Sequence, residues 1–298
     1  MTTRVRAVTE EAVALTMRST RTLSHVTGRL SEPSPSSPPN PHFGVARAAA
    51  IGAGDARVWE RARDGHAEAM APDSLATVAA EITECRACPR LVAWREAVAV
   101  EKRASFRDDT YWGRGVPGFG DPHARVLVLG LAPAAHGANR TGRVFTGDRS
   151  GDWLFASMYR NGFANQPISV AADDGLTLSG AYVSAAVRCA PPANAPTPSE
   201  RDTCLPFFVR ELALLADVRV IVTLGAFAYE ALWAMLRSAG VVLPRPRPKF
   251  THGLEVPTAR ATIVGCFHPS QQNTFTGKLT EPMIDAVFAR ARELSDLS

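Results

Sequence analysis

The chain has 298 residues, of which 46% are hydrophobic, and a formal net charge of +4 at neutral pH. This length allows two average domains, or one domain of about 220 residues with an extension. No apolar run approaches the ~20 residues that a membrane span needs, and the N-terminal region lacks the apolar core of a secretory signal. We therefore expect a soluble, cytoplasmic protein, whose mildly basic charge suits a polyanionic partner.

Residues 1–74 differ in composition from the rest of the chain. Pro and Ser dominate the segment 32–41, and runs of Ala, Arg and Gly flank it. Such a composition is typical of linkers, because it offers too little apolar surface to join a packed core. We predict a flexible extension over 1–74 and one folded domain over 75–298.

From residue 75 onward, apolar periodicity predicts alternating helices and strands. Helices are expected over 75–82, 91–101, 152–161, 199–215, 226–238 and 281–294, and strands over 125–129, 182–187, 218–224 and 261–267. Ser199, followed three residues later by Asp202, is the expected N-cap of the fourth helix. Strands that alternate with such helices indicate right-handed βαβ units. The expected fold class is therefore α/β, a three-layer α/β/α sandwich with a central four-stranded parallel sheet.

The loop after the first predicted strand, residues 130–151, is unusually rich in glycines and in polar groups. It contains two arginines before an aromatic residue, Phe145, and a carboxylate, Asp148. In open α/β sheets, ligands bind outside the carboxyl ends of the strands, where this loop begins. The alternative is that this loop is a glycine-rich connector that binds no ligand. That alternative gives no reason for the large number of polar groups in the loop.

Four of the five cysteines form two pairs. Cys85 and Cys88 are separated by two residues, and Cys189 and Cys204 follow a hundred residues later. Four sulfurs from two pairs can hold a tetrahedral zinc ion or a four-iron cluster, and spacing alone does not choose between them. Unrelated buried thiols are the alternative. Cys266 lies in the fourth predicted strand, where we expect a small core residue.

Two further polar groups follow predicted strands. His268 comes directly after the fourth strand, with Pro269 and Ser270 behind it, and Asn194 lies in the loop after the second strand. An imidazole and an amide delivered at the carboxyl ends of parallel strands can face the same cleft as the first loop. We therefore expect these side chains to meet there.

Three separate motifs together resemble the uracil-DNA glycosylase superfamily, most closely its family 5. They are the loop 130–148, the segment that begins at His268, and the four paired cysteines, and the resemblance covers roughly 75–294. It implies a monofunctional DNA glycosylase of base excision repair, which flips uracil out of DNA and hydrolyses its N-glycosidic bond. The implied partner is single- or double-stranded DNA, bound by a nucleoid-associated monomer. The implied cofactor is a structural 4Fe-4S cluster, held by Cys85, Cys88, Cys189 and Cys204.

The resemblance also implies roles for individual residues. As catalytic residues, Asp148 would hold the attacking water or support the sugar cation, and His268 would donate a hydrogen bond to O2 of the departing uracil. Phe145 would stack on the base. The remaining substrate-binding residues would be Ala134, Ala135, His136 and Asn194, and the DNA-binding residues Arg140, Ser270, Gln272 and Asn273.

Two departures from the superfamily patterns carry consequences. Other members place an Asp or Asn in the first motif to orient water, and family 4 has a Glu after the Gly, whereas this chain has Leu131 and then Ala-Pro-Ala at 132–134. Family 4 also reads uracil with an Asn where this chain has Ala185. We therefore expect looser base discrimination, extending to hypoxanthine and ethenocytosine.

Basic residues support a DNA partner to a limited extent. Arg140, Arg143 and Arg149 crowd the first motif, and a second strip of cations lies among prolines at 244–249. Both groups suit phosphate contacts, although ordinary solvated charges explain the second strip equally well. An iron-sulfur redox protein and a catalytically inactive DNA-binding protein are the alternative functions. A nucleotide-binding module is disfavoured, because the chain has neither a P-loop nor a GxGxxG motif.

Overall fold

A computed structural model of the chain describes residues 73–296. The predicted extension over 1–74 thus lies, apart from Asp73 and Ser74, outside the described residues. The strands are β1 (Phe119–Gly120), β2 (Val126–Gly130), β3 (Ala181–Ala185), β4 (Val220–Leu224), β5 (Glu255–Pro257) and β6 (Thr262–Cys266). The helices are α2 (Leu75–Glu84), α3 (Pro89–Glu101), α4 (Ala138–Thr141), α5 (Arg149–Arg160), α6 (Pro198–Leu214), α7 (Ala226–Ser238), α8 (Gln271–Phe275) and α9 (Glu281–Asp296), with 3-10 turns η1 (Ala104–Phe106) and η2 (Pro192–Asn194).

The strands form one six-stranded sheet in the order β1-β3-β2-β4-β6-β5. The four central strands are parallel, as the sequence predicts, and they pair in register from Val126 beside both Ala181 and Val220. The expected total of four strands is wrong, because β1 and β5 add an antiparallel strand at each edge. These edge strands are two and three residues long, too short to show an alternating apolar pattern.

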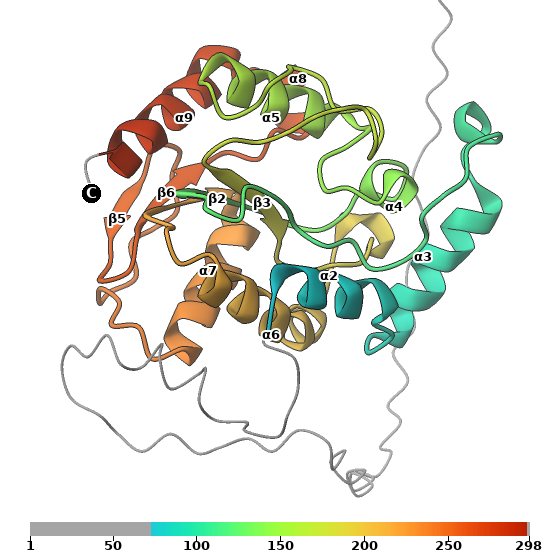
Figure 1. Cartoon of the computed structure of the whole chain (residues 1–298), viewed down its shortest axis with the longest axis horizontal. Helices are drawn as coiled ribbons and strands as arrows, with labels where there is room; N and C mark the ends of the chain where they lie inside the picture. The colour runs from blue at the N-terminus through green and yellow to red at the C-terminus, as the bar shows by residue number, and fades with distance from the viewer. Residues whose placement is uncertain (1–72, 297–298) are drawn as a thin grey trace, which may run out of the picture. The chain divides into compact units, whose positions relative to one another are not determined.

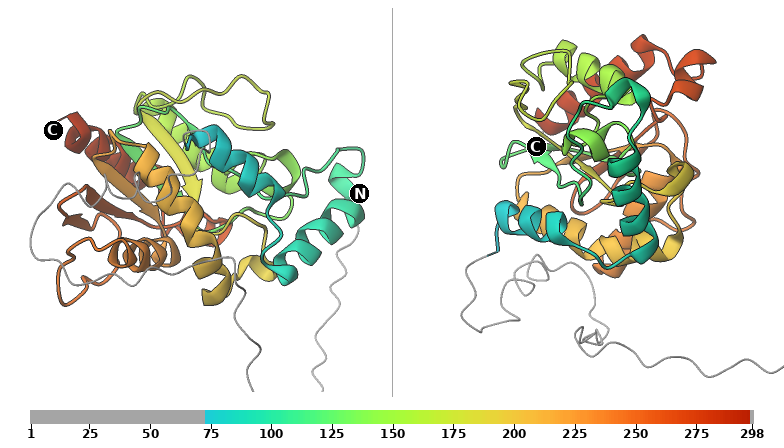
Figure 2. Two further views of the ribbon diagram at one scale, coloured as in Figure 1. Left: turned by 60° about the horizontal axis from the view of Figure 1, so that its bottom comes forward. Right: turned by 90° about the vertical axis from the view of Figure 1, so that its right-hand side faces the viewer.

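Helices cover both faces of the sheet, which confirms the three-layer α/β/α arrangement (Figures 1 and 2). Alternate residues of each strand point to opposite faces, so Val126 and Val128 pack with α5 and α9 on one side. Leu127 and Leu129 pack with α6 and α7 on the other side. The two apolar clusters explain why the central strands appear in the sequence as short unbroken apolar runs.

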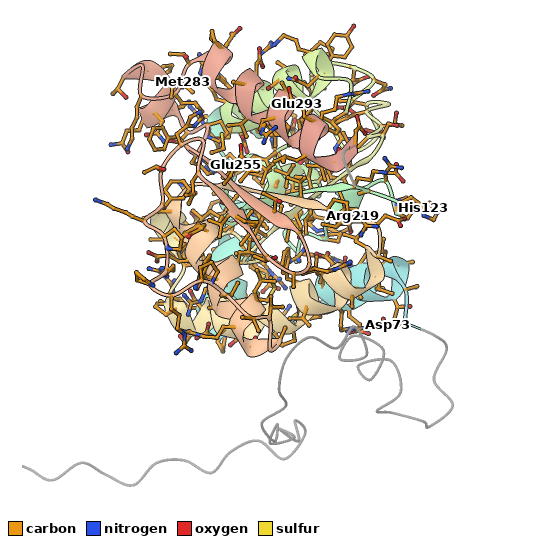
Figure 3. All side chains as sticks on the ribbon, turned by 90° about the vertical axis from the view of Figure 1, so that its left-hand side faces the viewer. Asp73, His123, Arg219, Glu255, Met283 and Glu293 are labelled. Carbon is orange, nitrogen blue, oxygen red and sulfur yellow. The ribbon has the colours of Figure 1, made fainter. Side chains whose placement is uncertain are left out.

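Ion pairs fasten the outer elements to this core. Arg290 of α9 binds Glu255 on the edge strand β5 at 2.8 Å and Glu293 one turn along its own helix at 3.0 Å, on the face drawn in Figure 3. Arg210 of α6 binds Asp73 at 2.8 Å, which holds the start of α2 against α6. Exposed pairs of this kind contribute little individually. The apolar core therefore supplies most of the energy that holds these helices in place, and the ion pairs add to it at the surface.

Three helix starts differ from the sequence prediction. Helix α3 begins at Pro89, two residues before the expected position 91, with Pro at its first helical position. Helix α5 begins at Arg149, three residues before the expected start, because the Asp148 carboxylate caps it by accepting the Gly151 N–H at 3.0 Å. Helix α6 is capped by Thr197 and not by the expected Ser199. Thr197 accepts the Glu200 N–H at 3.2 Å, and the Glu200 carboxylate accepts the Thr197 N–H at 2.8 Å, which completes a capping box.

The chain reverses its direction of travel across the sheet at β2. Strand β3 lies on one side of β2, and β4 lies on the other. At such a switch point the loops from neighbouring strands diverge and leave a crevice at the carboxyl ends of the strands. The loops after β2, β3 and β6 all reach this crevice. None of the helices described is both long and apolar enough to cross a lipid bilayer.

Candidate active site

A cavity of about 1080 Å³ opens where the loops after β2, β3 and β6 meet. The expected convergence of these loops is therefore confirmed, while the individual roles stay predictions. Asn273 is the one predicted residue outside the lining, and its side chain instead donates to the His268 carbonyl at 2.8 Å. The predicted residues that line the cavity are Ala134, Ala135, His136, Arg140, Phe145, Asp148, Asn194, His268, Ser270 and Gln272.

Phe145 forms a rigid aromatic wall of the cavity. Its side chain is only 8% exposed, and its backbone has φ of 54°, a left-handed conformation that is uncommon for a residue with a bulky side chain. The ring rests on Gly130, where an added Cβ would lie 2.6 Å from ring carbons. It also lies 6.1 Å from the His268 ring, measured between centroids. The end of β2 therefore needs glycine to leave room for this ring.

Asp148 reaches the cavity from the N-terminus of α5. Besides accepting the Gly151 N–H, its carboxylate lies against Gly137, where an added Cβ would stand 2.2 Å from Oδ2. Burial raises the pKa of Asp148, and the hydrogen bonds from Gly151 and Ser150 oppose this only in part. A carboxylate with a raised pKa in a cavity is a candidate acid or base.

His268 faces the cavity as a neutral imidazole. Burial lowers its pKa to about 4, so the ring carries no charge at neutral pH. Gly225, which has a φ of 92°, follows the neighbouring strand β4. A Cβ added at Gly225 would lie only 3.2 Å from the Cβ of His268. Asn273 holds the His268 carbonyl, and Ser270 caps α8 by accepting the Asn273 N–H at 3.4 Å. The backbone of His268 is thus held by the start of α8, and its side chain lies close to Gly225.

The segment 134–139 forms a compact turn beside Asp148. The Ala134 carbonyl accepts from the backbone N–H groups of Gly137 and Asn139, at 3.2 and 3.0 Å. The fully buried Asn139 amide donates to the Ala135 carbonyl at 3.4 Å and to the Arg95 carbonyl at 3.2 Å. On the opposite side, Asn194 lines the cavity from η2 with φ of 54°. Backbone groups and one amide are therefore available to contact the edge of a planar ligand.

Two of the arginines of the first motif act within the protein. The Arg140 guanidinium binds Asp109 at 2.7 Å and the carbonyls of His136 and Gly147, although its side chain also lines the cavity. Its predicted contact with DNA stays a prediction.

Arg143 does not fit the phosphate contact expected of it. It is buried and makes a two-pronged ion pair with Asp174 at 2.7 and 2.8 Å. That expectation is wrong, because burial removes the guanidinium from any external phosphate. The pair instead fastens the loop 163–180 to the first motif.

His136 is an uncharged polar group in the cavity wall. Its Nδ1 lies 3.1 Å from the Tyr111 hydroxyl. Burial, followed by the positive charges of Arg103 and Arg140, lowers the pKa of His136. A neutral imidazole can present either a donor or an acceptor to a ligand.

The four paired cysteines lie in one region, and all are free thiols. Cys88 and Cys204 are within hydrogen-bonding contact of each other. Burial raises the pKa of Cys189, Arg95 lowers it, and the nearby Cys85 and Cys88 raise it further. Within residues 73–296, no three His, Cys, Asp or Glu side chains are grouped so as to hold a single metal ion. Cys266 is buried in β6 with an apolar cluster, as predicted for a core residue.

Sequence reasoning missed part of the cavity wall. Arg103 and Phe106, from the end of α3 and η1, also line it, and Arg140 lies 4.0 Å above the Phe106 ring. No motif marks these residues; a cationic stretch before Tyr111 is the only signal. Phe275 was also missed. It is 69% exposed at the end of α8, with the Arg149 guanidinium 5.0 Å from the centre of its ring.

Known proteins match this chain over most of its described length. A model of the Uracil DNA glycosylase superfamily matches residues 117–292. The type-5 uracil-DNA glycosylase of Mycobacterium tuberculosis is 52% identical over 226 residues, which cover 75% of this chain and 83% of that protein. That of Thermus thermophilus is 49% identical over 217 residues, covering 72% of this chain and 96% of the relative. The chain therefore belongs to the uracil DNA glycosylase superfamily, in which these similar relatives are of type 5.

Proposed function

We propose that the protein is a monofunctional DNA glycosylase that binds a flipped-out uracil in the cavity and hydrolyses its N-glycosidic bond. The observation that carries this proposal is the meeting of Phe145, Asp148, Asn194 and His268 in one cavity at the carboxyl ends of the parallel strands. Similarity to type-5 uracil-DNA glycosylases supports the choice of base. An aromatic wall, a carboxylate, an amide and a neutral imidazole are the groups that such a reaction needs.

In the reaction we infer, a water oxygen attacks C1′ of the deoxyribose and the bond from C1′ to N1 of uracil breaks. Asp148 orients the water and accepts its proton, or stabilises the positive charge that develops on the sugar. The electron pair of the broken bond leaves with the base. His268 donates a hydrogen bond to O2 of the base, where negative charge accumulates.

Base recognition is divided between stacking and hydrogen bonding. Phe145 offers a flat, immobile surface to a pyrimidine, because Gly130 and the protein core hold its ring. Asn194 and the backbone of 134–136 face the same space. An amide can pair with the N3–H and O4 groups of uracil, which differ from those of cytosine.

The rim of the cavity supports DNA binding. Arg103 and Arg149 are exposed there, and neither forms a salt bridge within the described part of the chain. Free guanidinium groups beside a pocket suit the phosphates on either side of a flipped nucleotide. The exposed Phe275 ring next to Arg149 offers a stacking surface for an unpaired base. Ser270 and Gln272 border the same rim.

We also propose that Cys85, Cys88, Cys189 and Cys204 hold a 4Fe-4S cluster. The donor set fits, since all four are free thiols, Cys88, Cys189 and Cys204 pack with the apolar side chains of Leu91 and Val187, and Cys85 lies near enough to Cys189 to raise its pKa. A buried guanidinium also donates to one of these sulfurs. When bound, the cluster would cross-link the start of α3 to the loop after β3, and we assign it no step in base excision.

Cleavage of a uracil-containing duplex after alkali treatment tests the proposed activity. We expect strand scission with the wild-type protein and a loss of at least about 100-fold in the His268→Ala and Asp148→Asn variants, as for other groups that act on a developing charge. Binding without scission by the wild-type protein would favour the inactive DNA-binding alternative. Visible absorbance of a cluster with neither scission nor binding would favour the redox alternative.

The base range is proposed to extend beyond uracil. Ala185, which replaces the Asn of family 4, lies in the cavity wall, and the cavity volume of about 1080 Å³ admits a purine. We expect excision of hypoxanthine and ethenocytosine from matched duplexes, and a preference for uracil in an Ala185→Asn variant. Release of uracil alone by the wild-type protein would contradict the wider range while leaving the glycosylase assignment intact.

A further inference from the structure

Three arginines surround the four paired cysteines, and two of them have carboxylate partners. Arg90 binds Glu200 through two hydrogen bonds of 2.7 Å, and Arg188 binds Glu211 at 2.5 and 3.0 Å. These pairs hold the segments that carry Cys88, Cys189 and Cys204. Arg95 differs, because within residues 73–296 no carboxylate lies within salt-bridge distance of it.

Arg95 is nevertheless among the most deeply buried side chains of the protein, at 1% exposure. One terminal nitrogen donates to the Cys189 sulfur at 2.8 Å, and the other donates to the Cys85 carbonyl at 2.9 Å. The Arg95 carbonyl accepts from the buried Asn139 amide. The guanidinium Nε is buried and has no hydrogen-bond partner among the residues that the structure describes. The side chain is therefore aimed at the cysteine region and held at both ends.

A buried charge without an opposite charge costs several kcal/mol, so a folded protein retains one only where something compensates it. Four thiolates on a metal centre carry net negative charge, and hydrogen bonds to their sulfurs tune the stability and potential of the centre. We propose that Arg95 is the positioning residue of the four-cysteine centre. Its guanidinium balances the charge of the centre and donates a hydrogen bond to the Cys189 ligand. This inference rests on the cluster proposed above.

A purely structural role is the competing explanation. In that case Arg95 would serve only to bind the Cys85 carbonyl, which follows the end of α2, and to fill space beneath Asn139. Removing the guanidinium would then lower the stability of the whole domain without a specific effect on the metal centre. The two explanations differ in what happens to the metal while the fold persists.

The experiment compares three variants of the full chain purified without oxygen. Arg95→Met removes the charge and the donors, and Arg95→Lys keeps the charge but loses the two-pronged geometry. Arg86→Met is the matched control, because Arg86 lies between Cys85 and Cys88 in the sequence but is 62% exposed and binds Glu96. Iron and acid-labile sulfide per chain, visible absorbance, and the rate of iron loss to a chelator are measured, with circular dichroism reporting the fold.

We expect Arg95→Met to lose iron at least about tenfold faster than the wild-type protein, in the range found for groups that support metal ligands. Arg95→Lys should fall between them, and Arg86→Met should match the wild-type protein. If Arg95→Met does not fold, Arg95→Lys carries the comparison. Iron loss from the Arg95 variants at the rate of the Arg86 control would overturn the proposal.

The same samples separate this inference from the proposed activity. Wild-type protein that contains no iron and sulfide but releases uracil would overturn the cluster and the role of Arg95, and would leave the glycosylase intact. Wild-type protein that contains the cluster but releases no base would overturn the proposed activity. The role of Arg95 would still be decided by the rates of iron loss.

Discussion

At the scale of single residues, Asp148 has two opposite effects on the stability of the fold. As N-cap of α5 it stabilises the helix, but its charge is buried beside Gly137 and its pKa is raised. A carboxyl group whose pKa is higher in the folded than in the unfolded state destabilises the fold at any pH where it must ionise, and this cost disappears below the ordinary range for Asp. The role proposed for Asp148 therefore requires this carboxyl group to ionise against the cost of its burial.

We therefore predict that Asp148→Asn stabilises the protein while it inactivates the site. Asn caps helices about as well as Asp does, so the cap is kept and the buried charge is lost. The free energy of unfolding should rise at pH 7, and the gain should vanish as the pH falls below about 4. Denaturant titrations at the two pH values measure this. Lower stability of the variant at pH 7 would contradict a raised pKa at this position.

The glycine opposite Asp148 gives an independent test of the geometry. In Gly137→Ala, the new methyl group would meet Oδ2 of Asp148 at 2.2 Å, so the carboxylate must move. A small displacement of a reacting group can cost about 100-fold in rate. We expect a fall of that order in the single-turnover rate of uracil release, with DNA affinity almost unchanged. An unaltered rate would show that the position of Asp148 does not matter.

The pH profile of uracil release follows from the same two groups. The raised pKa of Asp148 moves the acid limb of the single-turnover rate to higher pH than an unperturbed Asp would give, since the base must be ionised. His268, with a pKa of about 4, is neutral at neutral pH and adds no limb near the ordinary pKa of histidine. We expect one acid limb, absent from the residual activity of Asp148→Asn. A limb near pH 6.5 that disappears in His268→Gln would contradict the neutral imidazole.

At the scale of elements, helix α6 carries Cys204 and Glu211. The position of these residues depends on where the helix begins, which its N-cap determines. The structure assigns the cap to Thr197, whereas the sequence pattern favoured Ser199. Both Ser and Thr are good caps, and the Pro at 198 shifts the start to the earlier residue, because Pro suits the first helical position.

These two hydroxyls allow a paired experiment. We predict that Thr197→Ala lowers the free energy of unfolding by about 1 kcal/mol, the usual cost of a lost cap, whereas Ser199→Ala changes it by less than about 0.5 kcal/mol. Denaturant unfolding of both variants under the same conditions gives the comparison. Equal losses in the two variants, or a larger loss in Ser199→Ala, would place the cap where the sequence suggested.

At the scale of the whole molecule, local patterns predicted the parallel core well. The runs that became β2, β3, β4 and β6 pack against apolar clusters on both faces of the sheet, so each appears in the sequence as a short apolar run. The antiparallel edges β1 and β5 were missed, since two or three residues carry no periodicity. The convergence of Phe145, Asp148, Asn194 and His268 was predictable because parallel strands deliver their loops to one edge.

Other features depend on partners far away in the sequence, and no local pattern reveals them. Arg143 has the local sequence of a surface cation, but it is buried and paired with Asp174, thirty-one residues later. Arg95 and Phe106 belong to no motif, and only the fold brings them to the cysteines and to the cavity. Contacts of this kind are set by the fold as a whole and not by the local pattern.

The central claim is that the cavity accepts a flipped uracil and cleaves its bond to the sugar. Its most direct test is chromatographic measurement of free uracil released in a single turnover from a uracil-containing duplex, by the wild-type protein and by Asp148→Asn. The account predicts free uracil and an intact abasic strand from the wild-type protein, with release slowed at least about 100-fold in the variant. Equal release by both proteins, or none by the wild-type protein, would contradict it.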